Sequence, residues 1–211
     1  MISLIKDDYS AKISEQFTSL LKEIKNLRSL KFEKLELIDN CFKKFIGISS
    51  NFVNKISDED LLQLLEKNNK LQGNLCAICA ALLYEEGNLY IDTNSSEAYS
   101  RYLKGFIVIL NIFTENIECE IEGYYETAFK LASKLEELKL LPKEEEMLYK
   151  FYKSTGKYSK AEDYLYYLYD NSFVEKNQII DFYEELLSKN DNELIDGNLS
   201  REEILSAINE L

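Results

Sequence analysis

The sequence has no histidine and no tryptophan, and only one proline and seven glycines among 211 residues. Without histidine the chain cannot form a Ser–His–Asp or Cys–His nucleophile, an imidazole general base or a His-ligated zinc site. The few glycines form neither GxGxxG nor GxxxxGK[ST], so the usual nucleotide-binding loops are absent. The single proline, Pro142, precedes three glutamates, which is typical of a helix start. This composition favours long helices joined by short connections.

Basic residues are also in deficit: 25 lysines and arginines face 38 acidic residues, which gives a net charge of −13. Nucleic acid and anionic membranes both require a cationic surface, so we expect neither as a primary partner. The deficit is uneven, because residues 1–45 hold nine basic and seven acidic residues, whereas residues 175–211 hold three and ten. A solubilising surface is the simplest interpretation. The acidic end could instead attract the N-terminal segment or a basic partner.

No apolar run is long enough to cross a bilayer, which takes about 20 residues. The longest runs are Leu75–Tyr84 and Phe106–Leu110, and the N-terminus lacks the apolar region of a signal peptide. Hydrophobic residues still make up 45% of the chain, enough for a buried core. We therefore expect a cytoplasmic protein whose four cysteines stay reduced.

Apolar residues recur three and four positions apart along most of the chain, which predicts about ten helices and no convincing strand. A helix over residues 31–46 would turn Phe32 toward the core and stop at Gly47. A helix over residues 70–86 is apolar on nearly every side, so we expect it to be the most buried element. Gly87 would end that helix.

Start signals place several of the remaining helices. Ser95 or Ser96 would cap one helix, another is expected over residues 118–138, and Ser172 would cap a third. No long linker rich in glycine, proline or serine separates these elements. We therefore predict one all-α domain that covers residues 1–211.

Residues 148–168 resemble a tetratricopeptide unit, in which two antiparallel helices recur about every 34 residues. Gly156 would end the first helix in a left-handed conformation, and Ala161 would let the two helix backbones approach closely. Fainter copies around residues 28–42 and 87–102 do not keep a regular period. We therefore expect a tetratricopeptide-like stack of antiparallel helices with irregular repeats.

Four segments carry a resemblance to a known protein family: DDYSAKISEQF at 7–17, FEKLELID at 32–39, GKYSKAEDYLYYL at 156–168 and ELLSKNDNELIDGNLSREEI at 185–204. Through them the chain resembles an uncharacterised family of bacterial proteins of about this length with a tetratricopeptide-like, all-helical fold. The resemblance implies this fold for the whole chain. It implies no activity, because the family has no established function.

A C-x-x-C motif and a calcium-loop-like segment each have a plainer structural interpretation. Cys76 and Cys79 lie within the alanine-rich predicted helix with no second ligand pair, so core packing explains them better than zinc or redox chemistry. The segment Asn192–Glu203 resembles a calcium loop, but Leu194 stands where an oxygen ligand is required. A turn followed by a capping box from Ser200 to Glu203 explains the same residues.

Carboxylates also gather at Glu118, Glu120, Glu122 and Glu126. Such a group could suggest acid–base or di-metal chemistry, but di-iron bundles require Glu-x-x-His, and the chain has no histidine. A solvated helix face is the better interpretation. We therefore expect no metal and no cofactor.

Tyrosines provide the one candidate partner-binding surface that the sequence offers. They are Tyr149, Tyr152, Tyr158, Tyr164, Tyr166, Tyr167 and Tyr169. The last four span most of a helix circumference, so some must be exposed or face a neighbouring element. An exposed tyrosine offers rigid contact area and one hydroxyl group. Alternatively, the rings fill space between irregular helix pairs.

Together these features favour a non-enzymatic helical-repeat module that binds an unidentified protein or peptide. The acidic surface favours a basic or neutral partner. The alternative is a self-associating structural protein that forms a homodimer through the aromatic surface. An enzyme that relies on carboxylates ranks third, because the sequence shows no convergent set of polar groups.

Overall fold

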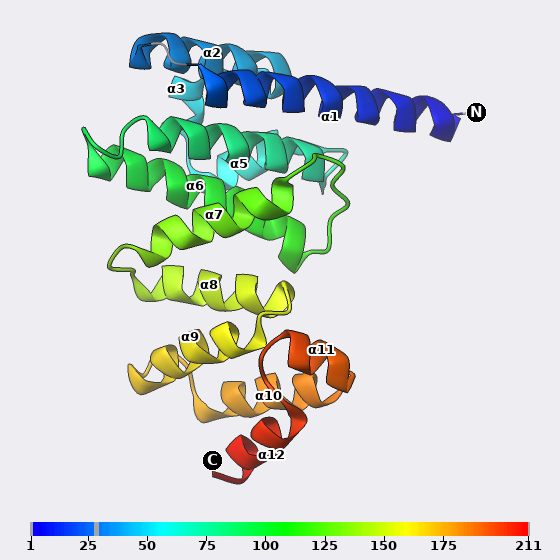
Figure 1. The fold of residues 1–211 in the computed structure, drawn as a ribbon, viewed down its shortest axis with the longest axis vertical. Coiled ribbons are helices and arrows are strands. Elements are labelled where there is room, and N and C mark those ends of the chain that lie inside the picture. Colours follow the sequence, from blue (N-terminus) through cyan, green and yellow to red (C-terminus); the bar gives the residue numbers. More distant parts are fainter. Residues whose placement is uncertain (1, 28–29, 211) are drawn as a thin grey trace. The chain divides into compact units, whose positions relative to one another are not determined.

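The computed structural model describes residues 2–27 and 30–210, with side chains from residue 11 onward. This part of the chain contains twelve helices and one very short hairpin, which confirms the all-α class (Figure 1). The chain divides into two compact units, residues 1–138 and residues 139–211, here called unit 1 and unit 2. Each is described by itself, and the expectation of a single domain stays a prediction.

Unit 1 is built around two long helices that pack on each other. Its elements are α1 (Ile2–Asn26), α2 (Lys31–Phe45), α3 (Ser50–Val53), α4 (Asp58–Leu64), β1 (Glu66–Lys67), β2 (Lys70–Leu71), α5 (Gly73–Asn88), α6 (Ser95–Thr114) and α7 (Tyr124–Glu136). Helix α5 packs most extensively on α6 and also contacts α1, α2 and α7. It therefore forms the centre of this unit.

Helix α5 is buried on nearly all sides, as its apolar sequence predicts. Its residues 76–83 are all buried, and Gly87 is buried as well. The prediction that Gly87 ends the helix is wrong, because α5 continues to Asn88. A Cβ at Gly87 would lie 2.5 Å from the Cε1 of Tyr102 on α6. Glycine at this position therefore makes room for a neighbouring ring.

Helix α2 ends as predicted, with Gly47 at a φ of +89°. The prediction that Phe32 points inward is wrong, since 74% of this residue is exposed. The buried face of α2 consists of Ile38, Cys41 and Phe42, which lie in its second half. The apolar period of the sequence runs one turn further toward the N-terminus than the packing does.

Two further helix starts differ from the prediction. Asn94 caps α6, and its side-chain oxygen accepts a hydrogen bond from the backbone N–H of Glu97, so neither Ser95 nor Ser96 is the cap. Residues 118–122 are not helical, and α7 begins only after Gly123, whose φ is +77°. Residues 118–121, which the sequence assigns to a longer helix, instead form an extended segment over α5, and residues 122–123 form a turn (Figure 1).

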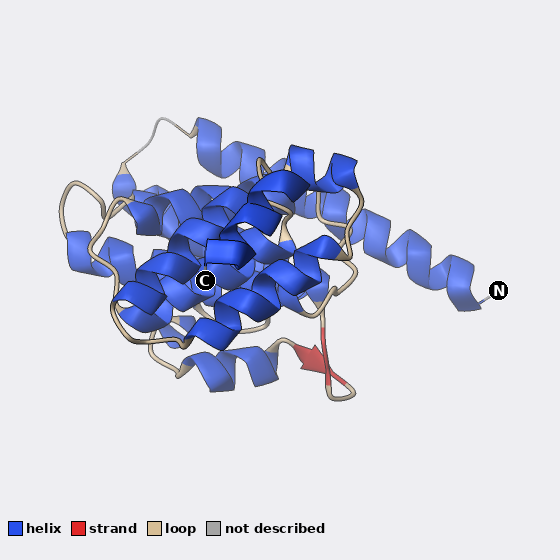
Figure 2. Ribbon diagram, turned by 90° about the horizontal axis from the view of Figure 1, so that it is seen from below, coloured by secondary structure: helices blue, strands red, loops and turns tan. Residues whose placement is uncertain are grey.

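A hairpin that the sequence analysis missed joins α4 to α5 (Figure 2). Asn68 and Asn69 connect β1 to β2, with φ values of 54° and 57°. Two consecutive left-handed residues are typical of a type I′ turn. With two residues in each strand, no alternating pattern can develop in the sequence.

Unit 2 consists entirely of helices in its described residues. They are α8 (Pro142–Ser154), α9 (Tyr158–Asp170), α10 (Lys176–Leu187), α11 (Asp191–Asp196) and α12 (Arg201–Glu210). Pro142 is the first residue of α8, as predicted. Helices α8 and α9 form the predicted antiparallel pair, with Gly156 at a φ of +70° in the turn and Ala161 fully buried.

The end of α9 corrects another predicted cap. Ser172 does not start α10; it follows the C-cap residue of α9 with a φ of +63°. The N–H of Phe173 then bonds back to the carbonyl of Leu168 at 2.9 Å. This pattern is a Schellman motif, which usually employs glycine at the left-handed position. The chain uses serine there.

Candidate functional site

The predicted tyrosine surface is mostly turned inward within unit 2. Tyr152 and Tyr158 are buried; the half-buried residues are Tyr149, Tyr164, Tyr166 and Tyr169. Tyr167 is 47% exposed, more than any other member of the set. Of the four tyrosines that span the circumference of α9, Tyr167 is thus exposed and the other three are half-buried. Their part in binding a partner stays a prediction.

Ring contacts account for the inward tyrosines. Tyr152 of α8 stacks on Tyr164 of α9, with ring centroids 5.8 Å apart and planes at 10°. Tyr149 meets Phe182 of α10 edge to face at 6.0 Å, and burial raises the pKa of its hydroxyl to about 12. These rings fill the space between neighbouring helices, which is the structural alternative that the sequence leaves open.

The C-x-x-C motif lies in the core of α5. Cys76 and Cys79 are fully buried, and burial raises the pKa of the Cys76 thiol to about 12. The thiolate is the form that attacks disulfides and binds metals, so such a thiol is inert at neutral pH. Core packing explains both residues.

The calcium-loop-like segment is a helix followed by a cap. Helix α11 occupies Asp191–Asp196, and Leu194 at the third loop position is fully buried. The Ser200 N–H donates to the Glu203 carboxylate at 2.7 Å, while the Glu203 N–H donates to the Ser200 hydroxyl at 3.3 Å. This is the predicted capping box, and it occupies the carboxylate that would have to hold the ion.

A buried charged network, which the sequence analysis missed, joins α3, α5 and α6. The Glu86 carboxylate accepts hydrogen bonds from Ser50 Oγ at 2.8 Å and from Asn54 Nδ2 at 3.0 Å. Arg101 Nε lies 3.2 Å from the same carboxylate without the alignment of a hydrogen bond, so the contact is ionic. A second contact, from Arg101 NH1, reaches Glu97 one turn earlier on α6. Both oxygens of Glu86 are thereby used, so the network stabilises the fold and offers no open ligand position.

Unit 1 also has an open groove of about 800 Å³. One wall comes from the hairpin and the start of α5, and the other from the end of α6 and the extended segment after it. Its lining residues include Leu62, Glu66, Asn69, Lys70, Leu71, Gln72, Asn111, Glu115, Asn116, Ile117, Glu118 and Glu120. We call this hollow the acidic groove.

Charge in the acidic groove is strongly one-sided. It contains four carboxylates, Glu66, Glu115, Glu118 and Glu120, and one cation, Lys70. All four glutamates are exposed, and none forms an ion pair with another described side chain. Carboxylates that are left uncompensated around a hollow attract cationic groups.

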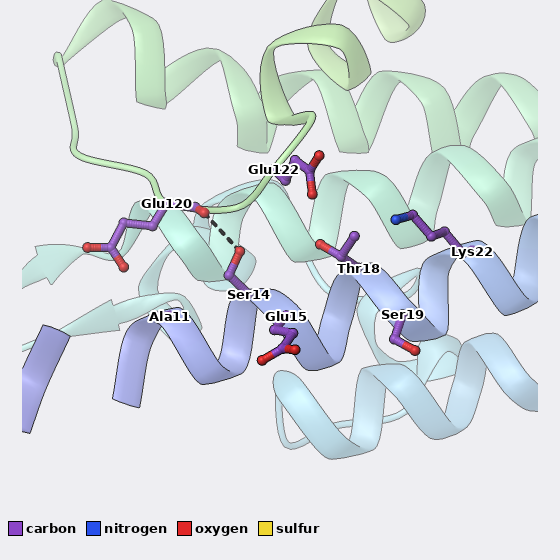
Figure 3. A pocket seen from close by; sticks show the side chains of 8 residues that line it. All are labelled: Ala11, Ser14, Glu15, Thr18, Ser19, Lys22, Glu120 and Glu122. Carbon is purple, nitrogen blue, oxygen red and sulfur yellow. Dashed lines mark hydrogen bonds between the residues drawn. The ribbon is translucent and has the colours of Figure 1, made fainter. Parts of the chain in front are cut away.

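Close backbone packing fixes the far wall of the groove. A Cβ at Gly73 would lie 2.2 Å from the carbonyl oxygen of Glu118, so the extended segment crosses directly over the start of α5. The side-chain oxygen of Asn74 accepts a hydrogen bond from the Glu120 N–H at 2.7 Å. On the other side, Ser14 of α1 donates to the Glu120 carbonyl at 2.9 Å (Figure 3). The segment is therefore held from both sides.

A second hollow of about 600 Å³ lies on the α1 side of this segment (Figure 3). Glu15, Glu120 and Glu122 contribute carboxylates to it, and Lys22 contributes a cation. Small residues of α1 supply most of the remaining lining. The sequence predicts that Glu118, Glu120, Glu122 and Glu126 share one solvated helix face. In the structure only Glu126 lies on a helix, α7, whereas the other three belong to the non-helical segment that borders the two hollows.

Comparison with protein families gives one match. The model of DUF6483, described as a family of unknown function, matches residues 4–211. The chain belongs to this family. Its DUF6483 match extends over both units, so the family corresponds to nearly the whole chain. Neither the curated proteins nor the solved structures contain a match.

The family description supplies no activity for a DUF6483 chain. Within the described residues, no helix is both long and apolar enough to cross a membrane. In the same part of the chain, no three potential metal-ligating side chains converge. Of the two hollows described above, the acidic groove has the more one-sided charge.

Proposed function

We propose that this protein is a non-enzymatic, tetratricopeptide-like module that binds a protein or peptide through the acidic groove of unit 1. The proposal includes a bacterial origin and a cytoplasmic location. The observation that supports it most is the set of four uncompensated carboxylates around a groove of about 800 Å³. Sites of about 300–1,000 Å³ can enclose a ligand of several side chains.

The nature of the groove favours binding over catalysis. Its carboxylates are exposed to water, and none is held in a buried position that would tune it for proton transfer. Amide side chains such as Asn69, Asn111 and Asn116 line the same groove and can donate to or accept from a peptide backbone. The net charge of −13 would speed the approach of a cationic partner.

Selection from a random peptide display library tests this function. We expect the full chain to enrich a defined peptide family. Changing Glu115→Gln together with Glu118→Gln should weaken binding by about tenfold, since each exposed charge pair contributes up to about 1 kcal/mol. The matched control is Glu184→Gln with Glu202→Gln, which removes the same charge from exposed positions of unit 2.

The control variant should bind as the unchanged protein does. Circular dichroism should show the same helix content for all three proteins. A selection that enriches no peptide family would overturn the proposal. If the groove variant and the control lose the same affinity, the loss comes from the change in net charge and not from the groove.

Self-association is a second candidate, favoured by two exposed aromatic residues of unit 2. Tyr167 is 47% exposed and Phe173 is 55% exposed. If they form a homodimer contact, light scattering gives twice the 24.6 kDa chain mass, and Phe173→Ser returns the mass to that of one chain. A mass of one chain at every concentration excludes this candidate.

A further inference from the structure

We infer that the acidic groove takes an extended peptide with lysine or arginine at alternate positions, and that the peptide pairs with the outer edge of β2. This inference rests on the proposed function and specifies its partner. Three features of the groove carry it: an unpaired strand edge, an apolar strip and the uncompensated carboxylates.

The strand edge follows from the register of the hairpin. Glu66 stands opposite Leu71, and Lys67 opposite Lys70. The next pair is hydrogen-bonded, since the Gln72 N–H donates to the Leu65 carbonyl at 3.0 Å. Hydrogen-bonded and non-bonded pairs alternate in an antiparallel ladder, so the N–H and C=O of Leu71 point away from β1. The sheet has only two strands in the described residues, so no third strand covers this edge of β2.

Leu71 belongs to the groove lining, together with Leu62 and Ile117. An incoming strand beside β2 would bond to the Leu71 backbone, which is the way that extended peptides add to exposed sheet edges. Its side chains would alternate between two faces. Glu66 and Leu71 stand opposite each other and therefore share one face of the hairpin, whereas Lys70 projects from the other face. On the face of Glu66 and Leu71 the cations of the peptide would reach the carboxylates, with their aliphatic stems on the apolar strip.

The charges select the peptide. Alternate side chains of a strand lie roughly 7 Å apart on one face, so successive cations can meet different carboxylates of the groove. Lys70 is the one cation in the lining, and it forms no ion pair with a described side chain. A basic peptide therefore gains attraction from Glu66, Glu115, Glu118 and Glu120 and meets repulsion from one lysine only. An acidic peptide of the same length would be repelled.

The probe is a fluorescein-labelled peptide of about nine residues in which lysine and valine alternate, roughly 30 Å long when extended. Fluorescence anisotropy with the full chain measures its affinity. We expect a glutamate–valine peptide to bind at least tenfold more weakly. Raising the salt from about 50 mM to about 500 mM should weaken the lysine peptide by about tenfold, because exposed charges are screened.

Backbone methylation tests the strand pairing separately from the charge. N-methylation of alternate residues blocks one edge of the peptide and leaves its charge unchanged. Methylation of the edge that faces β2 should lower the affinity about fivefold to tenfold, the loss expected for one or two hydrogen bonds. Methylation of the opposite edge should have little effect. Equal affinity of both methylated peptides would overturn the pairing with β2.

Two protein variants complete the test. Lys70→Glu should raise the affinity for the lysine peptide about threefold, because it replaces a repelling charge with an attracting one. A variant that merely damaged the fold would lower the affinity. Glu115→Gln with Glu118→Gln should lower it at least fivefold, and Glu184→Gln with Glu202→Gln should not.

The outcomes separate this inference from the proposed function. If library selection enriches peptides that are neither basic nor extended, the proposed function stands and the inference falls. If no library peptide and no lysine peptide binds, both fall. If lysine peptides bind but Lys70→Glu weakens them, the assignment of the site to the acidic groove is wrong.

Discussion

Replacing Glu86 with leucine is expected to lower the free energy of unfolding by about 3 kcal/mol, which is within the range for removing one partner of a buried ion pair. The change leaves the Arg101 guanidinium, in a residue 7% exposed, without its buried counter-charge. It also removes the acceptor for Ser50 and Asn54. We expect the lower end of the range because Glu97 still contacts Arg101 from its partly exposed position.

The double variant Glu86→Leu with Arg101→Leu distinguishes a lost ion pair from a general packing defect. Because it removes both charges, it should cost at least 1 kcal/mol less than the sum of the two single variants. Urea unfolding followed by circular dichroism measures all three. Glu97→Gln serves as the control, and it should cost under about 1 kcal/mol because this carboxylate is half exposed. Simple additivity of the two leucine variants would show that Glu86 and Arg101 are not coupled.

Replacing Gly73 with alanine is expected to cost about 3 kcal/mol and to abolish peptide binding. The new Cβ would lie 2.2 Å from the Glu118 carbonyl oxygen, and this neighbour is backbone, so the whole extended segment would have to move. Overpacking of a well-packed site costs roughly 1–3 kcal/mol, occasionally more, and the upper part applies where no flexible side chain can give way. Moving the segment displaces Glu118 and Glu120, so the acidic groove loses one wall.

Gly105→Ala is the matched control, since Gly105 also lies in a buried helix of unit 1. The nearest atom to its added Cβ is the Leu83 Cβ at 3.3 Å, which small shifts can accommodate. The higher helix propensity of alanine contributes about 1 kcal/mol in the opposite direction. The net change should stay below about 1 kcal/mol, with peptide binding intact. Equal destabilisation by both variants would mean that the contact with Glu118 has no special role.

Local signals in the sequence were sufficient to predict most of the helices. The apolar period placed α5 in the core, Pro142 marked the start of α8, and Gly156 marked the turn before α9. Each of these signals lies within a few residues of its effect. The error at Phe32 arises because the direction in which a side chain packs depends on a neighbouring helix that the sequence period does not contain. The error at Gly87 arises because glycine is read as a helix stop, whereas here it makes room for Tyr102 of α6.

The acidic groove could not be predicted, because its walls come from segments that are far apart in the sequence, residues 62–74 and residues 111–120. The contact between Asn74 and Glu120 joins them, with a sequence separation of 46 residues. Two of its carboxylates, Glu118 and Glu120, were visible in the sequence as a group, but a helical period was assumed for them, and the segment that carries them is not helical. For the tyrosines of α9, their spread around the helix predicts that some are exposed or face a neighbouring element. Which of them is exposed depends on the packing of the helix, and the structure identifies Tyr167.

Six of the seven glycines fall into two groups that evolution should treat differently. Gly73, Gly87 and Gly197 lie where a Cβ would come within 2.5 Å of another atom, so a relative that replaces one of them must also change its neighbour. Gly47, Gly123 and Gly156 have a positive φ and no atom closer than 3.9 Å to a Cβ. The chain already uses Asn116 and Asn198 in this conformation, so asparagine is the natural replacement at these three positions in other members of the family.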